Sequence, residues 1–179
     1  MNPKSYRHQH QKQLEISWER YGKMVKNLAK RAKDEFNPDC VVGNSKGGCI
    51  IGGTIAAILR KDFYPMRISR RTKDRVAFKK PRVSVLPPKD VAGKKVLLVD
   101  DMAVSGETLK MAGKILKQKK AKSIKTLTLA RHKDSFAPDF YGLSSDDCII
   151  FPWDRWIYTN RKFKIHPELV IPSKKRLPS

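Results

Sequence analysis

Residues 96–109 read VLLVDDMAVSGETL, and this stretch decides more about the fold than any other. Its first four residues, 96–99, are apolar, which is typical of a buried parallel strand. Asp100 and Asp101 follow at the expected end of that strand, and a loop of small residues then leads into a helix. In an open α/β sheet, ligands bind at the carboxyl ends of the strands, where such loops lie. The stretch therefore predicts an α/β fold with a ligand site at this loop.

The chemistry of the loop suits a phosphorylated sugar. Small residues such as Ser105, Gly106 and Thr108 let backbone N–H groups approach a phosphate, and the start of a helix adds the positive end of its dipole. The two aspartates lie beside this loop as partners for sugar hydroxyls. An acidic pair that only caps a helix or holds a magnesium ion is the alternative interpretation. The prediction therefore depends on the whole arrangement between a strand and a helix.

A second loop of the same kind is expected earlier in the chain. Residues 43–48 read GNSKGG and lie between a short apolar strand at 40–43 and a small-residue helix at 47–59. Lys46 lies among small residues, where backbone N–H groups and its ammonium could both meet an anion. A glycine pair at a strand–helix turn usually reflects turn geometry alone. Together with residues 96–109, however, it indicates a second anion-binding loop.

Composition indicates one domain. The chain has 179 residues, and 40% of them are hydrophobic, which is compatible with a packed core. No apolar run approaches the roughly 18 residues of a membrane span. Residues 1–13 are polar, so we expect neither a membrane partner nor a secretory signal. The three cysteines, Cys40, Cys49 and Cys148, show no metal-ligand spacing, so we expect free thiols and a cytoplasmic location.

The net charge of +22 permits nucleic-acid binding, but it does not decide the partner. Six lysines between Lys110 and Lys122 follow the opening motif, and they predict a solvated helix face. A denser group of cations occupies residues 67–75 and continues at Lys79, Lys80 and Arg82. The same field would steer a substrate that carries a pyrophosphate. Nucleic acid is therefore a possible partner, but not the favoured one.

Periodicity predicts strands alternating with helices, which argues for a parallel α/β sheet. Helices are expected at 14–36, 47–59 and 107–119, and strands at 40–43, 63–68, 83–86, 96–99, 123–130 and 148–151. Because it contains Pro65, the strand at 63–68 is expected to be an edge strand or to contain a bulge. Residues 70–80 are expected to form a mobile loop, and 92–95 and 137–142 to form turns. We expect a polar arm at 1–13, one domain at 14–164 and a loose basic tail at 165–179.

The two loops together resemble the sites of type I phosphoribosyltransferases. The family motif for phosphoribosyl pyrophosphate (PRPP) is an apolar strand, two acids, three residues and Thr/Ser-Gly-x-Thr, as in residues 96–108 here. The family's pyrophosphate loop commonly reads Ser/Ala-Arg/Lys-Gly-Gly, as in residues 45–48, and the peptide bond entering the Arg/Lys is often cis. Further segments are similar to short xanthine/hypoxanthine-guanine members of the family: Ser17–Glu19, Pro38–Asp39, Pro138–Tyr141 and Ile149–Asp154.

The resemblance implies a fold and an activity. The fold is a central, mostly parallel sheet flanked by helices, with a small hood formed by terminal segments. The activity is Mg²⁺-dependent transfer of ribose 5-phosphate from PRPP to a base nitrogen, with release of pyrophosphate. A purine such as hypoxanthine, guanine or xanthine is the expected acceptor. The resemblance also implies a homo-oligomer, either a dimer or a tetramer.

The resemblance also assigns roles to residues, most of which form three groups. The carboxylates of Asp100 and Asp101 would hold the ribose hydroxyls, directly or through Mg²⁺. Pyrophosphate would bind Ser45, Lys46, Gly47 and Gly48. The 5-phosphate would bind Ala103, Val104, Ser105, Gly106, Glu107 and Thr108. Residues 70–80 would form a lid that excludes water.

The expected base pocket departs from the family pattern. Hypoxanthine/xanthine-type members usually carry an aspartate where this chain has Val104, which cannot transfer a proton. An aromatic residue commonly occupies the position of Cys148. Lys133 is the candidate for a base carbonyl, and Arg131 is the alternative. The base-binding set is therefore Lys133, Cys148, Ile149, Ile150 and Phe151.

Two other functions remain open. One is a PRPP-sensing regulator that kept the phosphate loops and binds nucleic acid through its basic face, which Val104, Cys148 and the charge of +22 favour. The other is a phosphoribosyltransferase for a non-purine acceptor, which follows from Val104 alone. Trp153 and Trp156 are expected to pack rather than to form a stacking platform, because large aromatic side chains are mostly buried.

Overall fold

The computed structural model describes residues 12–69, 71–72, 75–76, 82–134 and 136–169. The chain divides into two compact units. The sheet unit comprises residues 19–146, and the terminal unit combines the segment up to Trp18 with the segment from Asp147 onward. The resemblance implies a hood made of terminal segments, and these segments do form a unit of their own. No described helix is long and apolar enough to cross a bilayer.

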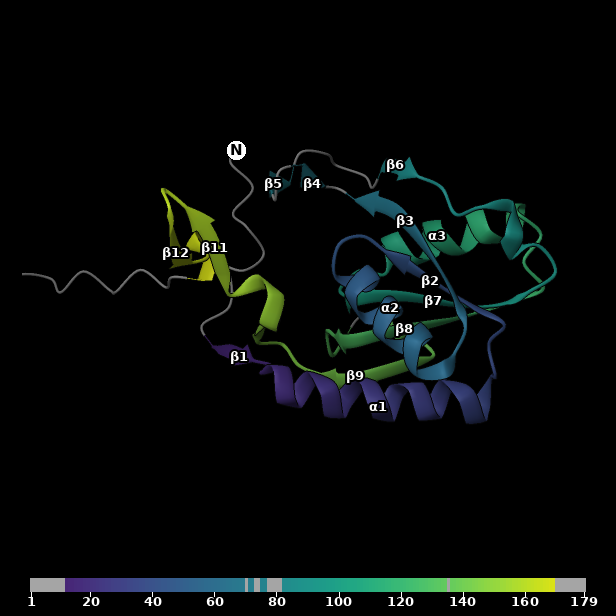
Figure 1. The fold of residues 1–179 in the computed structure, drawn as a ribbon, viewed down its shortest axis with the longest axis horizontal. Coiled ribbons are helices and arrows are strands. Elements are labelled where there is room, and N and C mark those ends of the chain that lie inside the picture. Colours follow the sequence, from purple (N-terminus) through teal and green to yellow (C-terminus); the bar gives the residue numbers. More distant parts are fainter. Residues whose placement is uncertain (1–11, 70, 73–74, 77–81, 135, 170–179) are drawn as a thin grey trace, which may run out of the picture. The chain divides into compact units, whose positions relative to one another are not determined.

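A six-stranded sheet with the order β6-β3-β2-β7-β8-β9 forms the centre of the sheet unit (Figure 1). All neighbouring strands are parallel except β6, which is antiparallel to β3. The expected mostly parallel α/β sheet is therefore confirmed. Its strands are β2 (Cys40–Asn44), β3 (Asp62–Ser69), β6 (Arg82–Val85), β7 (Lys95–Ala103), β8 (Ser123–Arg131) and β9 (Phe140–Ser144).

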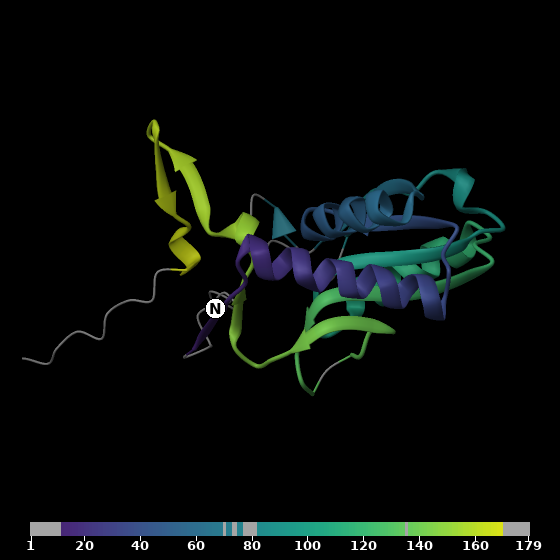
Figure 2. The ribbon, with the colours of Figure 1, turned by 60° about the horizontal axis from the view of Figure 1, so that its bottom comes forward.

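Helices cover both faces of this sheet (Figures 1 and 2). Helices α1 (Trp18–Glu35) and α2 (Gly47–Leu59) lie on one face, where the Tyr21 hydroxyl hydrogen-bonds Thr54 Oγ1 at 2.7 Å. Helix α3 (Glu107–Gln118) covers the other face. Val96 and Leu98 of β7 share one core cluster with Leu109, Ala112 and Leu116 of α3. Because side chains alternate along a strand, Leu97 points to the opposite face of the sheet. A short 3-10 helix, Lys89–Val91, precedes β7.

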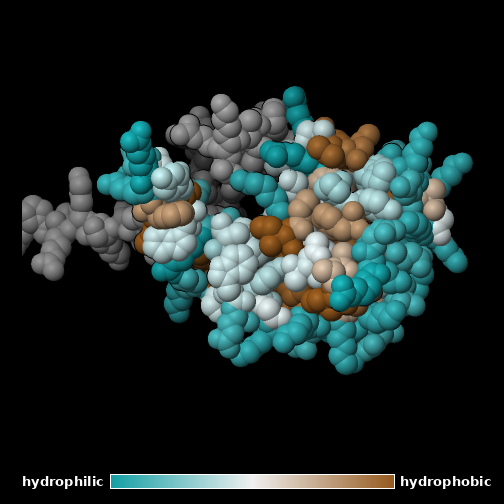
Figure 3. All heavy atoms as spheres, viewed as in Figure 1, coloured by the Kyte–Doolittle hydropathy of each residue, from teal (hydrophilic) through white to brown (hydrophobic). Residues whose placement is uncertain are grey.

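The outer surface of the sheet unit is uneven in polarity. Figure 3 shows hydrophilic side chains along α1 and a hydrophobic group at the β6 edge. This group consists of Val83, Val85 and Leu86, which are 41%, 45% and 56% exposed. The expected free thiols are confirmed, with Cys40 and Cys148 buried and Cys49 half-buried. Burial raises the pKa of the Cys40 thiol to about 11, so this thiol is protonated at neutral pH.

The first helix begins later than its periodicity predicts. Helix α1 starts at Trp18, whereas β1 (Gln13–Glu15) precedes it as a strand. Strand β1 runs parallel to β10 (Cys148–Ile150), and the Ile16 N–H donates to the Ile150 carbonyl at 2.9 Å. Pairing with a segment far along the chain overrides the local helical pattern, and that pairing is invisible in residues 14–36.

Three further predictions need correction. Strand β7 runs to Ala103 rather than ending at 99, so the acid pair lies inside the end of the strand. The turn predicted at 137–142 becomes strand β9 from Phe140, whose ring is buried. Strand β3 is internal rather than an edge, and its irregularity lies between Arg67 and Ile68. Strand β6 pairs with β3 only from Arg67 onward, so the missing N–H of Pro65 costs no bond to β6.

The segment predicted to be a mobile lid at 70–80 is only partly described. Residues Arg71–Thr72 (β4) and Arg75–Val76 (β5) form a short antiparallel pair within it. The other residues of this segment lie outside the described part of the chain. The lid therefore remains a prediction, and the antiparallel pair is an addition to the expected loop.

The terminal unit contains two small sheets. Strand β10 forms as predicted, but it pairs with β1 and not with the central sheet. Strands β11 (Trp156–Thr159) and β12 (Lys162–Ile165) form an antiparallel hairpin that the sequence did not predict. Its two turn residues, Asn160 and Arg161, have positive φ values of 51° and 58°, as a tight hairpin turn requires. Two short 3-10 helices complete the unit, Pro152–Asp154 and Pro167–Leu169.

Candidate functional site

The structure brings the two predicted loops into contact. Strands β2 and β7 are parallel neighbours, so the loop after β2 and the acid pair of β7 lie at the same edge of the sheet. A Cβ atom on Gly47 would overlap the carboxylate of Asp101, and one on Gly48 would overlap the backbone carbonyl of Val99. Only glycine lets the start of α2 approach the acid pair this closely. The glycine pair is therefore explained by this packing rather than by turn geometry alone.

Residues 45–48 present backbone donors beside the acid pair. The Ser45–Lys46 peptide bond is cis, as the resemblance implies. The Ser45 N–H donates to the Met66 carbonyl at 2.9 Å, which fixes the loop to β3. The first-turn N–H groups of an α-helix have no acceptor within the helix, so those of Gly47 and Gly48 are available to an anion. Lys46 is exposed at the same turn.

Asp100 is a buried carboxyl group with a raised pKa. It is 8% exposed, its Oδ1 accepts the Asp101 N–H at 3.0 Å, and its Oδ2 accepts Asn44 Nδ2 at 3.2 Å. Burial raises its pKa well above the usual range, and the charge of Asp101 raises it further. The two hydrogen bonds oppose this shift only in part. A bound cation or added hydroxyl donors would favour the ionised form, because both stabilise its negative charge.

Asn44 is a site residue to which the sequence assigned no role. This buried side chain accepts the Ile68 N–H at 2.8 Å, and its Nδ2 donates to the Ile68 carbonyl at 3.2 Å and to Asp100. It therefore ties Asp100 to β3, on the opposite side of β2 from β7. The available signal was an amide side chain at the end of the otherwise apolar strand CVVGN.

The predicted 5-phosphate loop, residues 103–108, leads into helix α3. Gly106 is its N-cap with a φ of 72°, and a Cβ atom there would overlap the ring of Phe136. The Glu107 N–H lies 3.4 Å from Ser105 Oγ, its acceptor. Ala103 is buried, Val104 and Thr108 are half-buried, and Ser105 and Glu107 are exposed. Phe136 is a second residue that the sequence missed, and a lone aromatic residue in the loop after β8 was its only signal.

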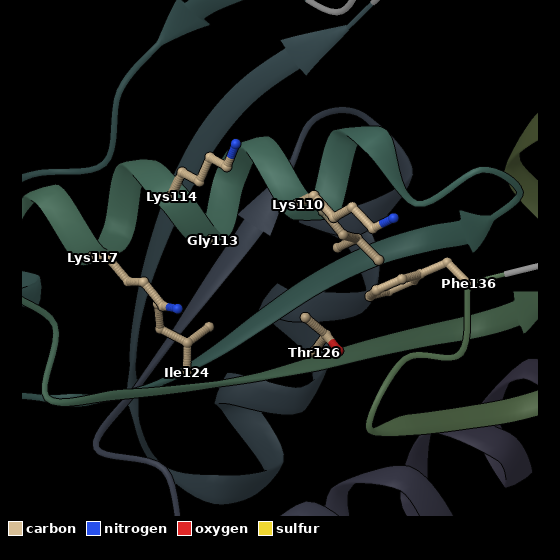
Figure 4. A pocket seen from close by; sticks show the side chains of 8 residues that line it. Lys110, Gly113, Lys114, Lys117, Ile124, Thr126 and Phe136 are labelled. Atoms are coloured by element: carbon tan, nitrogen blue, oxygen red, sulfur yellow. The ribbon is translucent and has the colours of Figure 1, made fainter.

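A shallow groove of about 380 Å³ lies between α3 and β8 (Figure 4). Three lysines of α3 and the ring of Phe136 surround an apolar floor, and Lys110 Nζ lies 5.5 Å from the ring centroid. None of the predicted site residues lines this groove. Its lining residues are Leu109, Lys110, Gly113, Lys114, Lys117, Ile124, Thr126 and Phe136.

The predicted base-binding residues fall in different environments. Lys133 is exposed, and its ammonium lies 3.6 Å from Asp146 Oδ2. Cys148, Ile149 and Ile150 are buried in β10 of the terminal unit. Phe151 is also buried, and its ring stacks on Trp153 with centroids 5.1 Å apart. The roles of these residues toward a base remain predictions.

The residues present suit a magnesium ion that is shared with a ligand. The described residues contain no group of three or more His, Cys, Asp or Glu side chains that could hold a metal. Asp100 and Asp101 offer two carboxylates, and Mg²⁺ commonly takes one or two carboxylates together with substrate oxygens and water. The donor set therefore fits Mg²⁺ bound with a phosphorylated ligand, but not an all-protein cage.

Comparisons with known proteins agree on one family. The phosphoribosyl transferase domain matches residues 10–159. Adenine phosphoribosyltransferase of Campylobacter hominis is 30% identical over 120 residues, which cover 62% of this chain and 65% of that protein. The chain thus matches less than two thirds of the length of this relative.

Solved structures of the same fold are also similar. Purine phosphoribosyltransferase from Pyrococcus horikoshii superposes with a TM-score of 0.70 at 26% identity, covering 79% of this chain and 93% of that one. Xanthine-guanine-hypoxanthine phosphoribosyltransferase from Helicobacter pylori gives a TM-score of 0.68 at 19% identity, with the same coverages of 79% and 93%. The second likeness establishes the fold alone.

Proposed function

The chain belongs to the phosphoribosyl transferase domain family, and on that premise we propose that it is a Mg²⁺-dependent phosphoribosyltransferase. It moves ribose 5-phosphate from PRPP to a nitrogen of a purine base and releases pyrophosphate. The observation that carries this proposal is the contact of Gly47 and Gly48 with the acid pair. It supports the proposal because the backbone N–H groups at the start of α2, which suit a pyrophosphate, then lie next to carboxylates that suit ribose hydroxyls.

Each part of the site then has a role in positioning or charge neutralisation, which are large terms in catalysis. Asp100 and Asp101 accept hydrogen bonds from the ribose hydroxyls, and their charge stabilises the positive charge that develops on the ribose ring. The start of α3 holds the 5-phosphate through its first-turn N–H groups. Lys46 and the start of α2 stabilise the negative charge of the leaving pyrophosphate. Magnesium, when bound, supplies further neutralisation of the pyrophosphate oxygens.

The acceptor base is the finer part of the proposal. Val104 has no group that can move a proton, so it cannot assist removal of the proton from a purine nitrogen. The similar proteins named above are described as adenine, purine and xanthine-guanine-hypoxanthine phosphoribosyltransferases, which supports a purine acceptor. Adenine therefore belongs in the test together with hypoxanthine, guanine and xanthine.

A pyrophosphate-release assay tests the activity. It combines the full chain with PRPP, Mg²⁺ and each of the four purines, with one pyrimidine base as a further arm. Turnover with at least one purine is expected, and omission of Mg²⁺ should remove it. Turnover with the pyrimidine alone would contradict the purine acceptor and favour a non-purine enzyme. Absence of turnover with every base would contradict the enzymatic proposal.

A PRPP-sensing regulator is the second candidate, and Val104 together with the charge of +22 favours it. Calorimetry of PRPP binding, combined with the pyrophosphate-release assay, separates the two functions. A regulator binds PRPP with Mg²⁺ but does not turn it over with any base, whereas an enzyme does both.

We also propose a homo-oligomer, for which the exposed Val83, Val85 and Leu86 at the β6 edge are a candidate contact. Sedimentation velocity with Val85→Lys tests it, because a buried lysine would dissociate the assembly.

A further inference from the structure

The β11–β12 hairpin of the terminal unit exposes an aromatic face. Trp156 lies opposite Ile165, and Tyr158 lies opposite Phe163. Cross-strand partners share a face of the sheet, so these four side chains lie together. Trp156 is 52% exposed, Ile165 45%, Tyr158 65% and Phe163 71%. The expectation that Trp156 packs as a buried aromatic residue is therefore wrong, because about half of its surface is exposed.

The same hairpin carries concentrated positive charge. Residues 155–165 read RWIYTNRKFKI, with four cations and no carboxylate. Arg155 forms an ion pair with Glu15 and lies 5.5 Å from the centroid of the Trp156 ring. Lys162 and Lys164 lie on the face opposite the rings. Within the described residues, no ion pair engages these two lysines or Arg161.

We propose that this hairpin binds single-stranded nucleic acid. Bases stack on Trp156, Tyr158 and Phe163 on one face, and the backbone of the flexible strand passes around the edge of this two-stranded hairpin. Its phosphates there meet Arg161 at the turn and Lys162 and Lys164 on the opposite face. Exposed aromatic rings on a sheet surface stack two or three unpaired bases in RNA-binding domains. Stacking tolerates any sequence, because every base has a flat face. Alternate residues of a strand lie about 7 Å apart, so Trp156 and Tyr158 form separate platforms.

The observations favour this partner over three others. A second copy of the chain would bring another cluster of four cations, and like charges within the Debye length of about 10 Å repel. A planar membrane in contact with the ring face would leave Lys162 and Lys164 pointing away from its anionic surface, because they lie on the opposite face of the hairpin. A nucleic-acid duplex offers phosphates but keeps its base faces stacked inside. Single strands are thus the partner that uses both the rings and the cations.

Fluorescence anisotropy of the full chain with labelled oligonucleotides tests the proposal. The probes are a 12-nucleotide RNA, a DNA of the same sequence and the matching duplex, each at several KCl concentrations. Both single strands should bind at least about tenfold more tightly than the duplex, because each stacked base adds about that factor. The RNA and DNA arms show whether the 2′-hydroxyl contributes.

Two variants separate stacking from charge. The variant W156L/Y158L/F163L keeps every cation and should lose about 100-fold in affinity for single strands, with an unchanged salt slope. The variant K162Q/K164Q keeps every ring and should reduce that slope by about 1.4, because each phosphate contact contributes about 0.7. Wild-type affinity in the leucine variant would overturn the proposal, because charge alone would then explain binding. Tyr158→Leu is a milder variant in case the triple one fails to fold.

Intrinsic fluorescence gives a second readout. Stacking should quench Trp156, and Trp156→Phe should remove the quenching while keeping most of the affinity. Asp101→Asn should bind the oligonucleotides as wild type does, so this inference and the proposed activity can fail separately. Vesicles of phosphatidylserine and sedimentation velocity complete the design. Binding to vesicles but not to oligonucleotides, or dimers lost in the leucine variant without any preference for single strands, would overturn the proposal.

Discussion

The acid-pair site and the β11–β12 hairpin differ in how far the protein itself buries and contacts the side chains that would meet a ligand. At the site, Asp100 is 8% exposed and both of its carboxylate oxygens accept hydrogen bonds from the protein. On the hairpin, Phe163 is 71% exposed, and the centroid of its ring lies 5.1 Å from that of Tyr158. The site is held in position before any ligand arrives, whereas the hairpin gains its packing only from a partner. Substitutions should therefore act through geometry at the site and through surface contact on the hairpin.

The largest effect should come from removing half of the acid pair. Asp101→Asn should lower kcat/KM by roughly 100- to 1,000-fold, as loss of a preorganised electrostatic contact does. The exposed Asp62→Asn, at the start of β3, is the matched control and should leave turnover unchanged. Pyrophosphate release measures both variants. Unchanged PRPP affinity by calorimetry in Asp101→Asn would mean that the ribose does not bind at this pair.

A single added methyl group should disturb the preformed site almost as strongly. Gly48→Ala places a Cβ atom against the backbone carbonyl of Val99 and 2.9 Å from the Asp100 Cα. Neither neighbour is a flexible side chain, so the start of α2 has to shift. Misplacement by about 1 Å can reduce turnover by roughly 100-fold. PRPP affinity from calorimetry and turnover report this loss.

The matched control lies in the same helix. A Cβ atom on Gly53 would meet nothing within 4 Å, so Gly53→Ala should keep full turnover. It should also stabilise the protein by about 0.5–1 kcal/mol, because alanine favours the helix over glycine. Equal losses in the two variants, measured by turnover and urea unfolding, would show that α2 as a whole is sensitive and that the contact with the acid pair is not special.

This close packing explains which parts of the molecule the sequence predicts. Gly48 packs against the backbone of Val99 and Asp100, and Gly47 packs against the side chain of Asp101. Few residue types fit such contacts, so the pattern can be recognised in the sequence. Asn44 was not assigned a role because its partner Ile68 lies 24 residues away and becomes a neighbour only when β2 pairs with β3. Local patterns predict contacts that restrict residue type, but they do not predict contacts that depend on strand order.

The missed elements have the same cause. The start of α1 was misplaced because β1 pairs with β10, a partner at the far end of the chain. The hairpin was missed because its turn, Asn160–Arg161, lacks the glycine that usually marks such turns. Its exposed rings could not be foreseen either, since exposure depends on which elements fail to cover a face.

Val104 tests whether the preformed site lacks one chemical group. Val104→Asp adds a carboxylate that can move a proton, and it should raise purine turnover about tenfold, below the roughly 100-fold of a well-placed general base. Val104→Asn has a similar size but cannot move a proton, so it should give no gain. PRPP affinity should stay the same in both. No gain from the aspartate would indicate that proton removal is not limiting, or that the acceptor is not a purine.

Asn44→Ala should have the smallest effect on turnover, and it should also shift the pH dependence of ligand binding. Loss of the Asn44 side chain leaves the buried Ile68 N–H without its acceptor, which should cost about 2 kcal/mol of unfolding free energy in urea titrations. Asp100 also loses a donor that lowers its pKa, so that pKa should rise further above the usual range.

The sign of the pH dependence follows from the raised pKa of Asp100. The folded protein holds this proton more tightly than the unfolded chain, so Asp100 lowers the unfolding free energy as pH rises from the ordinary aspartate range through its folded pKa. Affinity for Mg²⁺ with PRPP should instead rise over that interval, because binding needs the ionised carboxylate. In Asn44→Ala the midpoint of this rise should move to higher pH. A midpoint unchanged in calorimetric titrations would show that Asn44 does not tune Asp100, and the site would then be less tightly preorganised than its hydrogen bonds indicate.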